Sequence, residues 1–275
     1  MKKAFKNNLI VLFLSVLLLK MRLSVLSSGS SGNCFYVENK DDAVLIDAGI
    51  SCKQILERLS FIGRSPSKIK GVFITHEHTD HVRGADVFCR NFGIPVFATE
   101  KTSENCLLCS DADLINTIKN DETVKINEMN VEAFSKSHKA GDPVSYNIFN
   151  GKKVSVITDL GKCCKNVIDN VSDSNLLCIE ANHDLKMLEE GPYPWHLKRW
   201  ISGDTGHLSN TQAGLLLLEH SPIKLKNIVL SHLSQTNNTP ELAFRTVRGL
   251  LKERANFHPR VIAMGRGEIG GLIRA

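Results

Sequence analysis

The sequence predicts an α+β protein with four layers, an αββα sandwich in which two mixed β-sheets pack face to face and helices cover their outer surfaces. Short β-rich runs alternate with amphipathic segments from Met21 to the C-terminus, and no internal repeat or low-complexity segment interrupts them. No linker is long enough to separate a second domain, and the 275 residues, 42% of them hydrophobic, suffice for one large core. We therefore expect a single domain over residues 21–275.

Strands are expected where a short run of branched or aromatic residues lies between turn residues. The expected strands are 23–26, 35–38, 43–47, 71–75, 95–98, 124–126, 131–135, 145–149, 154–158, 176–180, 228–231 and 261–263. Helices are expected where apolar residues recur at helical spacing. The expected helices are 52–61, 82–92, 162–170, 211–220 and 240–254.

Segment 76–81 is the most informative part of the chain. It has the sequence His-Glu-His-Thr-Asp-His and lies between an expected strand and an expected helix. Imidazoles this close repel one another when protonated, whereas neutral imidazole and carboxylate both bind divalent cations such as zinc or manganese. The C-terminal ends of strands also carry the ligand sites of open α/β sheets. The pattern therefore favours a metal site over a solvated polar loop.

The motif at 76–81 resembles the His-x-His-x-Asp-His signature of the metallo-β-lactamase fold superfamily. Its remaining motifs have counterparts in this chain, each directly after or close to an expected strand: Asp47, His138, Asp159 and His232. The resemblance extends from about Met21 to the C-terminus. It implies the αββα fold, with the metal site along one edge between the sheets.

Finer features resemble the YycJ/WalJ branch of that superfamily. They are the Ser/Gly-rich loop 27–33, Glu-Ala-Asn-His-Asp at 180–184, Gly-His-Leu-Ser-Asn at 206–210 and His-Leu-Ser-Gln-Thr-Asn-Asn at 232–238. The resemblance implies a cytoplasmic, metal-dependent nuclease that hydrolyses DNA. One departure is segment 194–200, which carries two tryptophans where smaller or charged residues are expected and which affects a substrate-facing helix.

Two metal ions need about seven ligands, and the sequence supplies that number. We assign three residues to each ion and one to both: His76, His78 and His138 to the first, Asp80, His81 and His232 to the second, and Asp159 as the bridge. A water held between the ions would lose a proton near neutral pH and attack phosphorus in line. His183 competes with His232 for the last position. His232 is preferred because it directly follows an expected buried strand.

Two further residues are expected to act with Asp80 and Asp159 in catalysis. Asp47 is expected to accept a ring N–H of a ligand histidine and so fix its tautomer, with capping of a turn as the alternative. His207 is expected to reach the substrate. No amino-acid nucleophile is required by this chemistry.

Four residues are expected to contact the substrate. Ser30 and Asn33 lie in the Ser/Gly-rich loop, whose hydroxyl and backbone N–H groups suit a phosphate, although a tight hairpin is an equal interpretation. Ser209 and Asn210 directly precede the expected helix 211–220. For Ser209, capping that helix is the stronger interpretation.

Three functions are compatible with these motifs. The first is a two-metal phosphodiesterase, with DNA exonuclease the favoured form and a nucleic acid as its partner. The second is a hydrolase of small esters, lactones or thioesters, because the same metal pair polarises carbonyl groups. The third, a non-catalytic regulatory protein, is disfavoured because all seven ligands are present. A lactamase is disfavoured because Asp159 replaces a thiolate, and the 73 residues from Asp159 to His232 leave no room for the domain inserted in RNA-processing relatives.

Residues 1–20 form an apolar extension ahead of the expected domain, and three interpretations of it are possible. The run at 9–19, in which ten of eleven residues are apolar, is shorter than the roughly twenty that span a bilayer. A wrongly chosen start codon is preferred over a membrane-surface anchor or an export signal, and membrane association is not expected unless 1–20 are retained. Without its four lysines the net charge falls from +5 to +1, so charge alone does not indicate nucleic-acid binding. Eight cysteines with one lone Cys-x-x-Cys at 106–109 and no second such pair are typical of reduced thiols in the cytoplasm.

Overall fold

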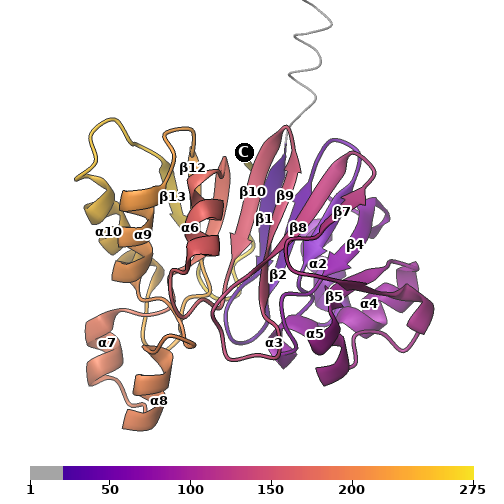
Figure 1. Ribbon diagram of the computed structural model, residues 1–275, viewed down its shortest axis with the longest axis horizontal. Helices are drawn as coiled ribbons and strands as arrows, with labels where there is room; N and C mark the ends of the chain where they lie inside the picture. Colours follow the sequence, from indigo (N-terminus) through magenta and orange to yellow (C-terminus); the bar gives the residue numbers. More distant parts are fainter. Residues whose placement is uncertain (1–20) are drawn as a thin grey trace, which may run out of the picture.

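The computed structural model describes residues 21–275 and confirms the predicted four-layer sandwich, with two sheets at the centre and helices on both sides (Figure 1). The first sheet has the order β14-β1-β2-β3-β4-β5-β6 and the second β13-β12-β11-β10-β9-β8-β7. The extension 1–20, predicted as a mis-assigned start or an anchor, lies outside the described residues. Within 21–275, no helix combines the length and the apolar character needed to cross a bilayer.

The strands of the first sheet are β1 (Arg22–Ser27), β2 (Cys34–Glu38), β3 (Ala43–Ile46), β4 (Ile69–Phe73), β5 (Val96–Thr99), β6 (Ile115–Ile118) and β14 (Ile273–Arg274). Those of the second are β7 (Thr123–Ile126), β8 (Met129–Ser135), β9 (Val144–Asn150), β10 (Lys152–Ile157), β11 (Leu176–Glu180), β12 (Asn227–Ser231) and β13 (Arg260–Ala263). Strands β3 to β6 are parallel to one another, as are β10 to β13. The C-terminal ends of each parallel set therefore meet at one edge of its sheet, where ligand sites are built.

The helices are α2 (Cys52–Phe61), α3 (Thr79–Val82), α4 (Ala85–Phe92), α5 (Glu100–Asn105), α6 (Lys165–Ser172), α7 (Leu185–Glu190), α8 (Trp195–Ile201), α9 (Asn210–His220) and α10 (Pro240–Leu251). Helices α2 and α4 cover the outer face of the first sheet, and α6, α9 and α10 cover that of the second (Figure 1). A third core lies between the sheets and includes Phe73, Tyr146 and Val156. Tyr146 donates its hydroxyl to Ile74 O at 2.8 Å and so ties the sheets together close to segment 76–81.

The predicted helix 82–92 begins three residues later in the structure, as α4, and a separate short helix, α3, precedes it. Gly84 N donates to Ala48 O at 2.7 Å, and a Cβ at Gly84 would lie 2.0 Å from Ile50 O. The chain changes direction here because Gly84 packs directly on the backbone that follows β3. Four further short elements were not predicted: β6, β14, α5 and α7. Helix α8 corresponds to the substrate-facing helix that the resemblance implies at 194–200.

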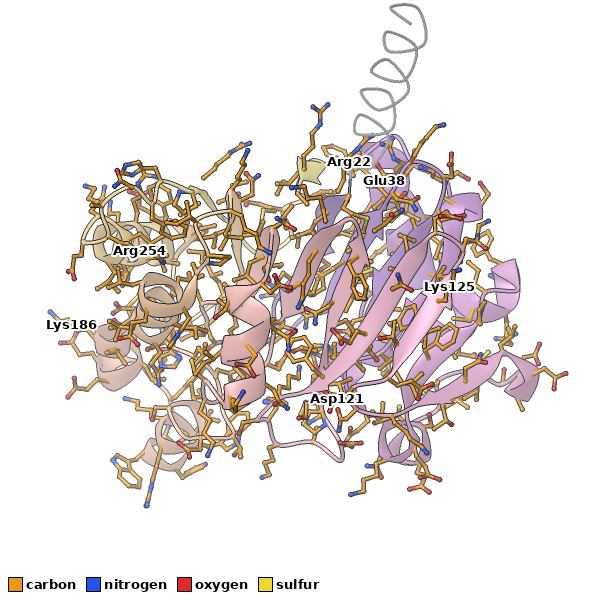
Figure 2. All side chains as sticks on the ribbon, turned by 45° about the horizontal axis from the view of Figure 1, so that its top comes forward. Arg22, Glu38, Asp121, Lys125, Lys186 and Arg254 are labelled. Carbon is orange, nitrogen blue, oxygen red and sulfur yellow. The ribbon has the colours of Figure 1, made fainter. Side chains whose placement is uncertain are left out.

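The edge of the first sheet opposite to these strand ends carries a buried ion-pair cluster around Glu38. Glu38 closes β2 opposite Ala43, the first residue of β3. Its carboxylate lies 2.7 Å from Arg64 Nε, 3.2 Å from Lys68 Nζ and 3.4 Å from Arg22 Nη1. Figure 2 shows Arg22 and Glu38 adjacent at this edge. The cluster joins β1 and β2 to the segment between α2 and β4.

Candidate metal centre

Three site residues directly follow strands and have a left-handed backbone. Asp47 follows β3 with φ 60°, His232 follows β12 with φ 55°, and Asp159 lies two residues past β10 with φ 54°. This conformation costs non-glycine residues of order 1 kcal/mol each. All three are buried and turn back between the two sheets, so the strand ends direct their side chains to one place.

The first group of candidate ligands consists of His76, His78 and His138. One ligand atom from each lies within 4.8 Å of the others. His76 Nε2 lies 3.0 Å from His78 Nδ1, and the ring of His138 lies 5.0 Å from that of His76. His138 Nδ1 lies 3.2 Å from Gly206 O, so this nitrogen donates to the carbonyl and Nε2 faces the group.

The second group consists of Asp80, His81 and His232, whose ligand atoms also lie within 4.8 Å of one another. Asp159 lies between the two groups. Its Oδ2 is 3.2 Å from His81 Nε2, and its Oδ1 is 3.4 Å from His232 Nε2 and 3.9 Å from His138 Nε2. The structure thus brings all seven predicted ligands together, with Asp159 in the central position expected of a bridge.

The unsatisfied atoms of the cluster fit a bound cation. His138 Nε2 and His232 Nε2 are buried and have no hydrogen-bond partner among the described residues. Buried polar atoms normally have a partner. Imidazole nitrogen and carboxylate oxygen are the donors that zinc and manganese accept. The residues present therefore suit divalent ions, and a cation would supply the partners that these nitrogens lack.

Asp47 orients the second group of candidate ligands through a hydrogen bond with the outer ring nitrogen of His81. Its Oδ2 accepts from His81 Nδ1 at 2.7 Å and from Thr75 Oγ1 at 3.0 Å, and its Oδ1 accepts from Thr75 N at 2.8 Å. A carboxylate on the outer ring nitrogen orients a metal-binding histidine and directs its other nitrogen inward. Asp47 is itself fully buried, and its contact with His81 is the one expected of a histidine partner rather than of a turn cap.

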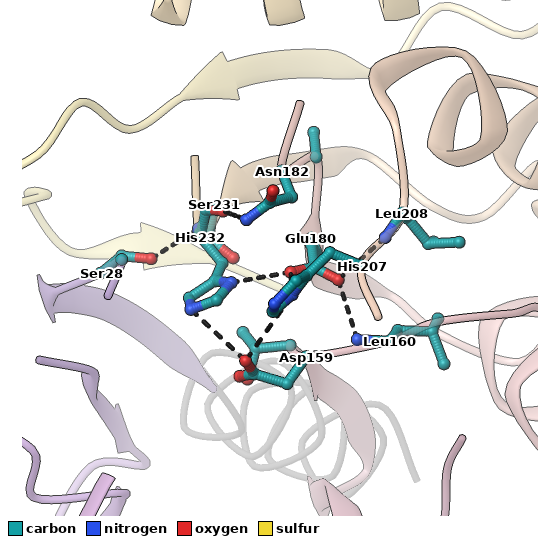
Figure 3. Close-up of polar contacts among 12 residues, drawn as sticks. Ser28, Asp159, Leu160, Glu180, Asn182, His207, Leu208, Ser231 and His232 are labelled. Atoms are coloured by element: carbon teal, nitrogen blue, oxygen red, sulfur yellow. Dashed lines mark hydrogen bonds and ion pairs between the residues drawn. The ribbon is translucent and has the colours of Figure 1, made fainter. Parts of the chain in front are cut away.

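Glu180 plays the equivalent part for His232 and was not among the predicted site residues. Its Oε1 accepts from His232 Nδ1 at 2.7 Å and from His207 Nδ1 at 2.8 Å (Figure 3). Its Oε2 accepts from the backbone N–H groups of Leu160 and Leu208. Burial opposes ionisation of Glu180, but the two imidazoles outweigh it and lower the pKa to about 2. The sequence contained one indication of this role: Glu180 ends a buried strand, and the other site residues also lie at or near strand ends.

The pKa shifts of four candidate ligand histidines differ in direction. Burial lowers the pKa of His138 to about 3 and that of His76 well below its ordinary value, which favours the neutral imidazole at both. Burial also opposes charge on His81 and His232, but Asp47 and Asp159 raise the pKa of His81, and Asp159 and Glu180 raise that of His232 to about 9. The carboxylates therefore create a strongly negative field in which positive charge is stabilised.

The predicted substrate residues have different surroundings. Ser30 is exposed and lines the cavity beside the cluster. Asn33 is fully buried, and its amide nitrogen lies 3.3 Å from Asp80 Oδ2 and 3.0 Å from His81 Nε2. Its amide is thus used to position candidate ligands rather than to contact substrate directly.

Ser209 and Asn210 have internal partners in place of the expected substrate contact. The Ser209 hydroxyl accepts from Gln212 N and caps α9 in a capping box. Asn210 donates to Asn238 Oδ1 at 2.9 Å. His183, the competitor of His232, is buried with both ring nitrogens unpartnered within the described part of the chain, and it belongs to neither group of candidate ligands.

A cavity of about 260 Å³ opens onto the cluster and contains His207 in its lining. On one side it is bounded by candidate ligands, among them His78, Asp80 and Asp159. The facing side is formed by residues from and beside α8. The cavity is therefore polar on the side of the metal centre and partly apolar on the other.

Comparisons with known proteins agree with this geometry. A family model described as the metallo-beta-lactamase superfamily matches residues 28–131. The exodeoxyribonuclease YycJ of Bacillus anthracis is 35% identical over 240 residues, which cover 85% of this chain and 90% of YycJ. The exodeoxyribonuclease WalJ of Streptococcus pneumoniae is 37% identical over 232 residues, which cover 82% of this chain and 86% of WalJ. The resemblance predicted from the motifs is thereby confirmed.

Solved structures confirm the fold. YhfI from Bacillus subtilis, a metallo-beta-lactamase fold protein, matches with a TM-score of 0.71 at 14% identity, over 94% of this chain and 100% of YhfI. PqqB from Methylobacterium extorquens matches with a TM-score of 0.68 at 15% identity, over 90% and 99% of the two chains.

Proposed function

The chain belongs to the metallo-β-lactamase superfamily, alongside the exodeoxyribonucleases YycJ and WalJ, and we propose that it is a DNA exonuclease that hydrolyses phosphodiester bonds with two divalent metal ions. The observation that supports this most is the cluster of seven candidate ligands. The exodeoxyribonucleases YycJ and WalJ match this chain over most of their own length. We assign the enzyme to the cytoplasm, in keeping with its eight free thiols.

We assign the candidate ligands to two ions in the way expected from the sequence. His76, His78 and His138 would hold the first ion, and Asp80, His81 and His232 the second, with Asp159 between them. Zinc and manganese both suit this donor set. When bound, such a pair lowers the pKa of a water and neutralises charge that grows on the phosphoryl oxygens.

His207 is the side chain best placed to handle a proton during the reaction. Its Nδ1 donates to Glu180 Oε1 at 2.8 Å, and the residue lines the cavity. Because Nδ1 is engaged, Nε2 is the nitrogen available to a substrate oxygen. We assign it the role of donating a hydrogen bond, or a proton, to the phosphoryl group.

Two guanidinium groups beside the cavity suit a DNA backbone. Arg83 Nη1 donates to Ser31 O and Arg266 Nε to Ser31 Oγ, each at 3.2 Å, and both arginines are exposed. Ser31 adjoins Ser30, which lines the cavity. Among residues 21–275, no lysine or arginine lines the cavity itself. Positive charge therefore adjoins the reaction site, where the phosphates that flank the scissile one would pass.

A hydrolase of small esters or thioesters is the second candidate. The partly apolar wall of the cavity favours it, because an acyl group needs an apolar surface. An apolar wall is equally compatible with a nuclease, because the faces of nucleobases are themselves apolar. The two candidates are separated by what the protein cleaves.

The deciding experiment is cleavage of end-labelled single-stranded and double-stranded DNA by protein that starts at Met21. It is run without metal, with manganese and with zinc, beside Asp80→Ala and His81→Ala. We expect stepwise, metal-dependent shortening that both substitutions abolish, with Arg245→Ala on the outer helix α10 as an unaffected control. Failure to cleave DNA with either metal, together with turnover of a thioester or lactone panel, would replace the nuclease by the acyl-hydrolase function.

A further inference from the structure

The apolar wall of the cavity is formed by one short segment, residues 193–201. Tyr193, Leu197, Trp200 and Ile201 face the same cavity as the candidate metal ligands. In Figure 1, α7 and α8 lie beyond the edge of the second sheet, below α9 and α10. Phosphodiester hydrolysis requires only polar and charged groups at phosphorus, so the wall contacts another part of the substrate.

The wall is fixed to the metal centre at several points. Tyr193 donates its hydroxyl to Thr236 Oγ1 at 3.2 Å, in the loop that follows His232. His207 N donates to Ile201 O at 2.8 Å, and the rings of Trp200 and His207 are perpendicular with centroids 5.6 Å apart. The wall thus has a set position relative to His207. Ile201 is buried, whereas Leu197 and Trp200 are only partly covered and leave apolar surface toward the cavity.

We propose that this wall binds the base of the nucleotide that carries the scissile phosphate, with the Trp200 ring as the aromatic surface and Leu197 beside it. The proposal rests on the proposed nuclease function. A base is the flat, apolar group next to every phosphate of DNA, and it stacks on aromatic side chains irrespective of sequence. The occupant is therefore any of the four bases.

The size of the cavity favours an unpaired base. A space of about 260 Å³ lies below the range typical of sites for drug-sized ligands. One unpaired base fits beside the metal centre more readily than a stacked base pair, so we expect single-stranded or frayed DNA ends to bind best.

Trp195 provides a matched control on the same helix. Its ring is 71% exposed, does not line the cavity, and lies 5.3 Å from the Arg199 guanidinium. Trp195→Ala removes an indole of the same kind from α8 without changing the cavity. Any effect shared by Trp195→Ala and Trp200→Ala would be an effect on the helix.

The test compares two single-stranded oligonucleotides that differ only in whether their terminal nucleotides carry a base or are abasic. Binding is measured by fluorescence anisotropy in EDTA, and cleavage with manganese. We expect wild type to bind and cleave the base-bearing oligonucleotide about tenfold or more better, mainly through KM, in line with the known strength of base–aromatic stacking. Trp200→Ala abolishes this difference, whereas Trp200→Phe and Trp195→Ala keep it.

The outcomes separate the two proposals. Equal binding of both oligonucleotides by wild type overturns the base-binding wall whether or not DNA is cleaved. If Trp200→Ala weakens binding of the base-bearing and the abasic oligonucleotide equally, the proposal is also overturned. Such a loss would reflect a structural defect and not a lost contact with the base. Absence of DNA cleavage with retained preference for the base-bearing oligonucleotide in EDTA refutes the nuclease function alone. If Trp200→Ala fails to fold, the wild-type comparison and Trp200→Phe decide.

Discussion

Glu180 and His232 form a buried pair in which the carboxylate Oε1 lies 2.7 Å from the ring Nδ1. The same oxygen also accepts from His207 (Figure 3). One carboxylate therefore orients both a candidate metal ligand and the side chain that we expect to contact the substrate. Asp47 has the corresponding contact with His81 on the first sheet. Each sheet therefore contributes one buried acid that fixes a histidine of the second metal site.

Removing the charge of Glu180 is expected to weaken the second metal site selectively. Glu180→Gln keeps the shape of the side chain but loses the charge that faces His232, and loss of such a partner typically lowers metal affinity about 10- to 100-fold. The measurement is competition with a chelator for manganese or zinc, resolved into two binding events. The event assigned to Asp80, His81 and His232 must weaken while the event assigned to His76, His78 and His138 stays within about twofold. Equal weakening of both would contradict the assignment.

Glu38→Gln is expected to destabilise the fold by breaking the ion-pair cluster at the opposite edge of the first sheet. Burial opposes its ionisation, but hydrogen bonds from Arg64 and Tyr36 outweigh burial and hold the pKa of Glu38 below its ordinary value. Breaking a buried charge pair costs about 3–5 kcal/mol, and we expect the lower end for Glu38→Gln because Arg22, Arg64 and Lys68 are partly exposed. Metal affinity should not change.

The pH dependence of this effect has a defined sign. A depressed folded-state pKa stabilises the protein above the unfolded-state pKa of about 4.3, and this stabilisation is lost as the pH falls through the folded-state pKa. Urea unfolding of wild type and Glu38→Gln should therefore give a large difference at pH 7 that shrinks below pH 4. A difference that persists unchanged at pH 3 would mean that the effect is not one of charge.

Much of this site could be predicted because its ligands belong to strand ends. The fold class is confirmed, and the residues predicted as ligands converge because the strands that precede them are parallel neighbours or face one another across the core. The preference for His232 over His183 used the same criterion. Helix 52–61 was predicted with its correct bounds from its apolar spacing, and in the structure Ser51 caps it in a capping box.

The remainder depended on tertiary contacts that spacing does not encode. Asn33 lies in a loop that is typical of phosphate sites, yet its amide is covered by Asp80 and His81. Glu180 follows four apolar residues and looks like the end of any buried strand; only the packing of His207 and His232 against it reveals its role. Helix α8 was expected only through the resemblance, as a substrate-facing helix at 194–200, because its seven residues expose one tryptophan and lack the usual amphipathic pattern.

Gly49 is expected to control the position of Asp80. A Cβ at Gly49 would lie 1.6 Å from Asp80 O and 2.7 Å from Asn33 N, which are backbone atoms that cannot move independently. Gly49→Ala should therefore displace Asp80, lower metal affinity at the second site and destabilise the fold by about 1–3 kcal/mol, as overpacking does. The control is Gly249→Ala in α10, where an added Cβ would meet no described atom within 4 Å outside the backbone of its own helix. This substitution should leave metal binding unchanged and stabilise the fold by up to about 1 kcal/mol.

Arg83 and Arg266 are expected to bind DNA phosphates without taking part in the reaction. Replacing both by Ala should lower DNA affinity and reduce the slope of log affinity against log salt by about 0.7 for each phosphate of a single strand that is no longer neutralised. Turnover of a small chromogenic phosphodiester should stay near wild type, because neither side chain lines the cavity. Arg245→Ala, which loses only an exposed pair with Glu241, is the control. An unchanged salt slope in the double variant would show that the DNA backbone follows another path, since neutralising fewer phosphates must release fewer counterions.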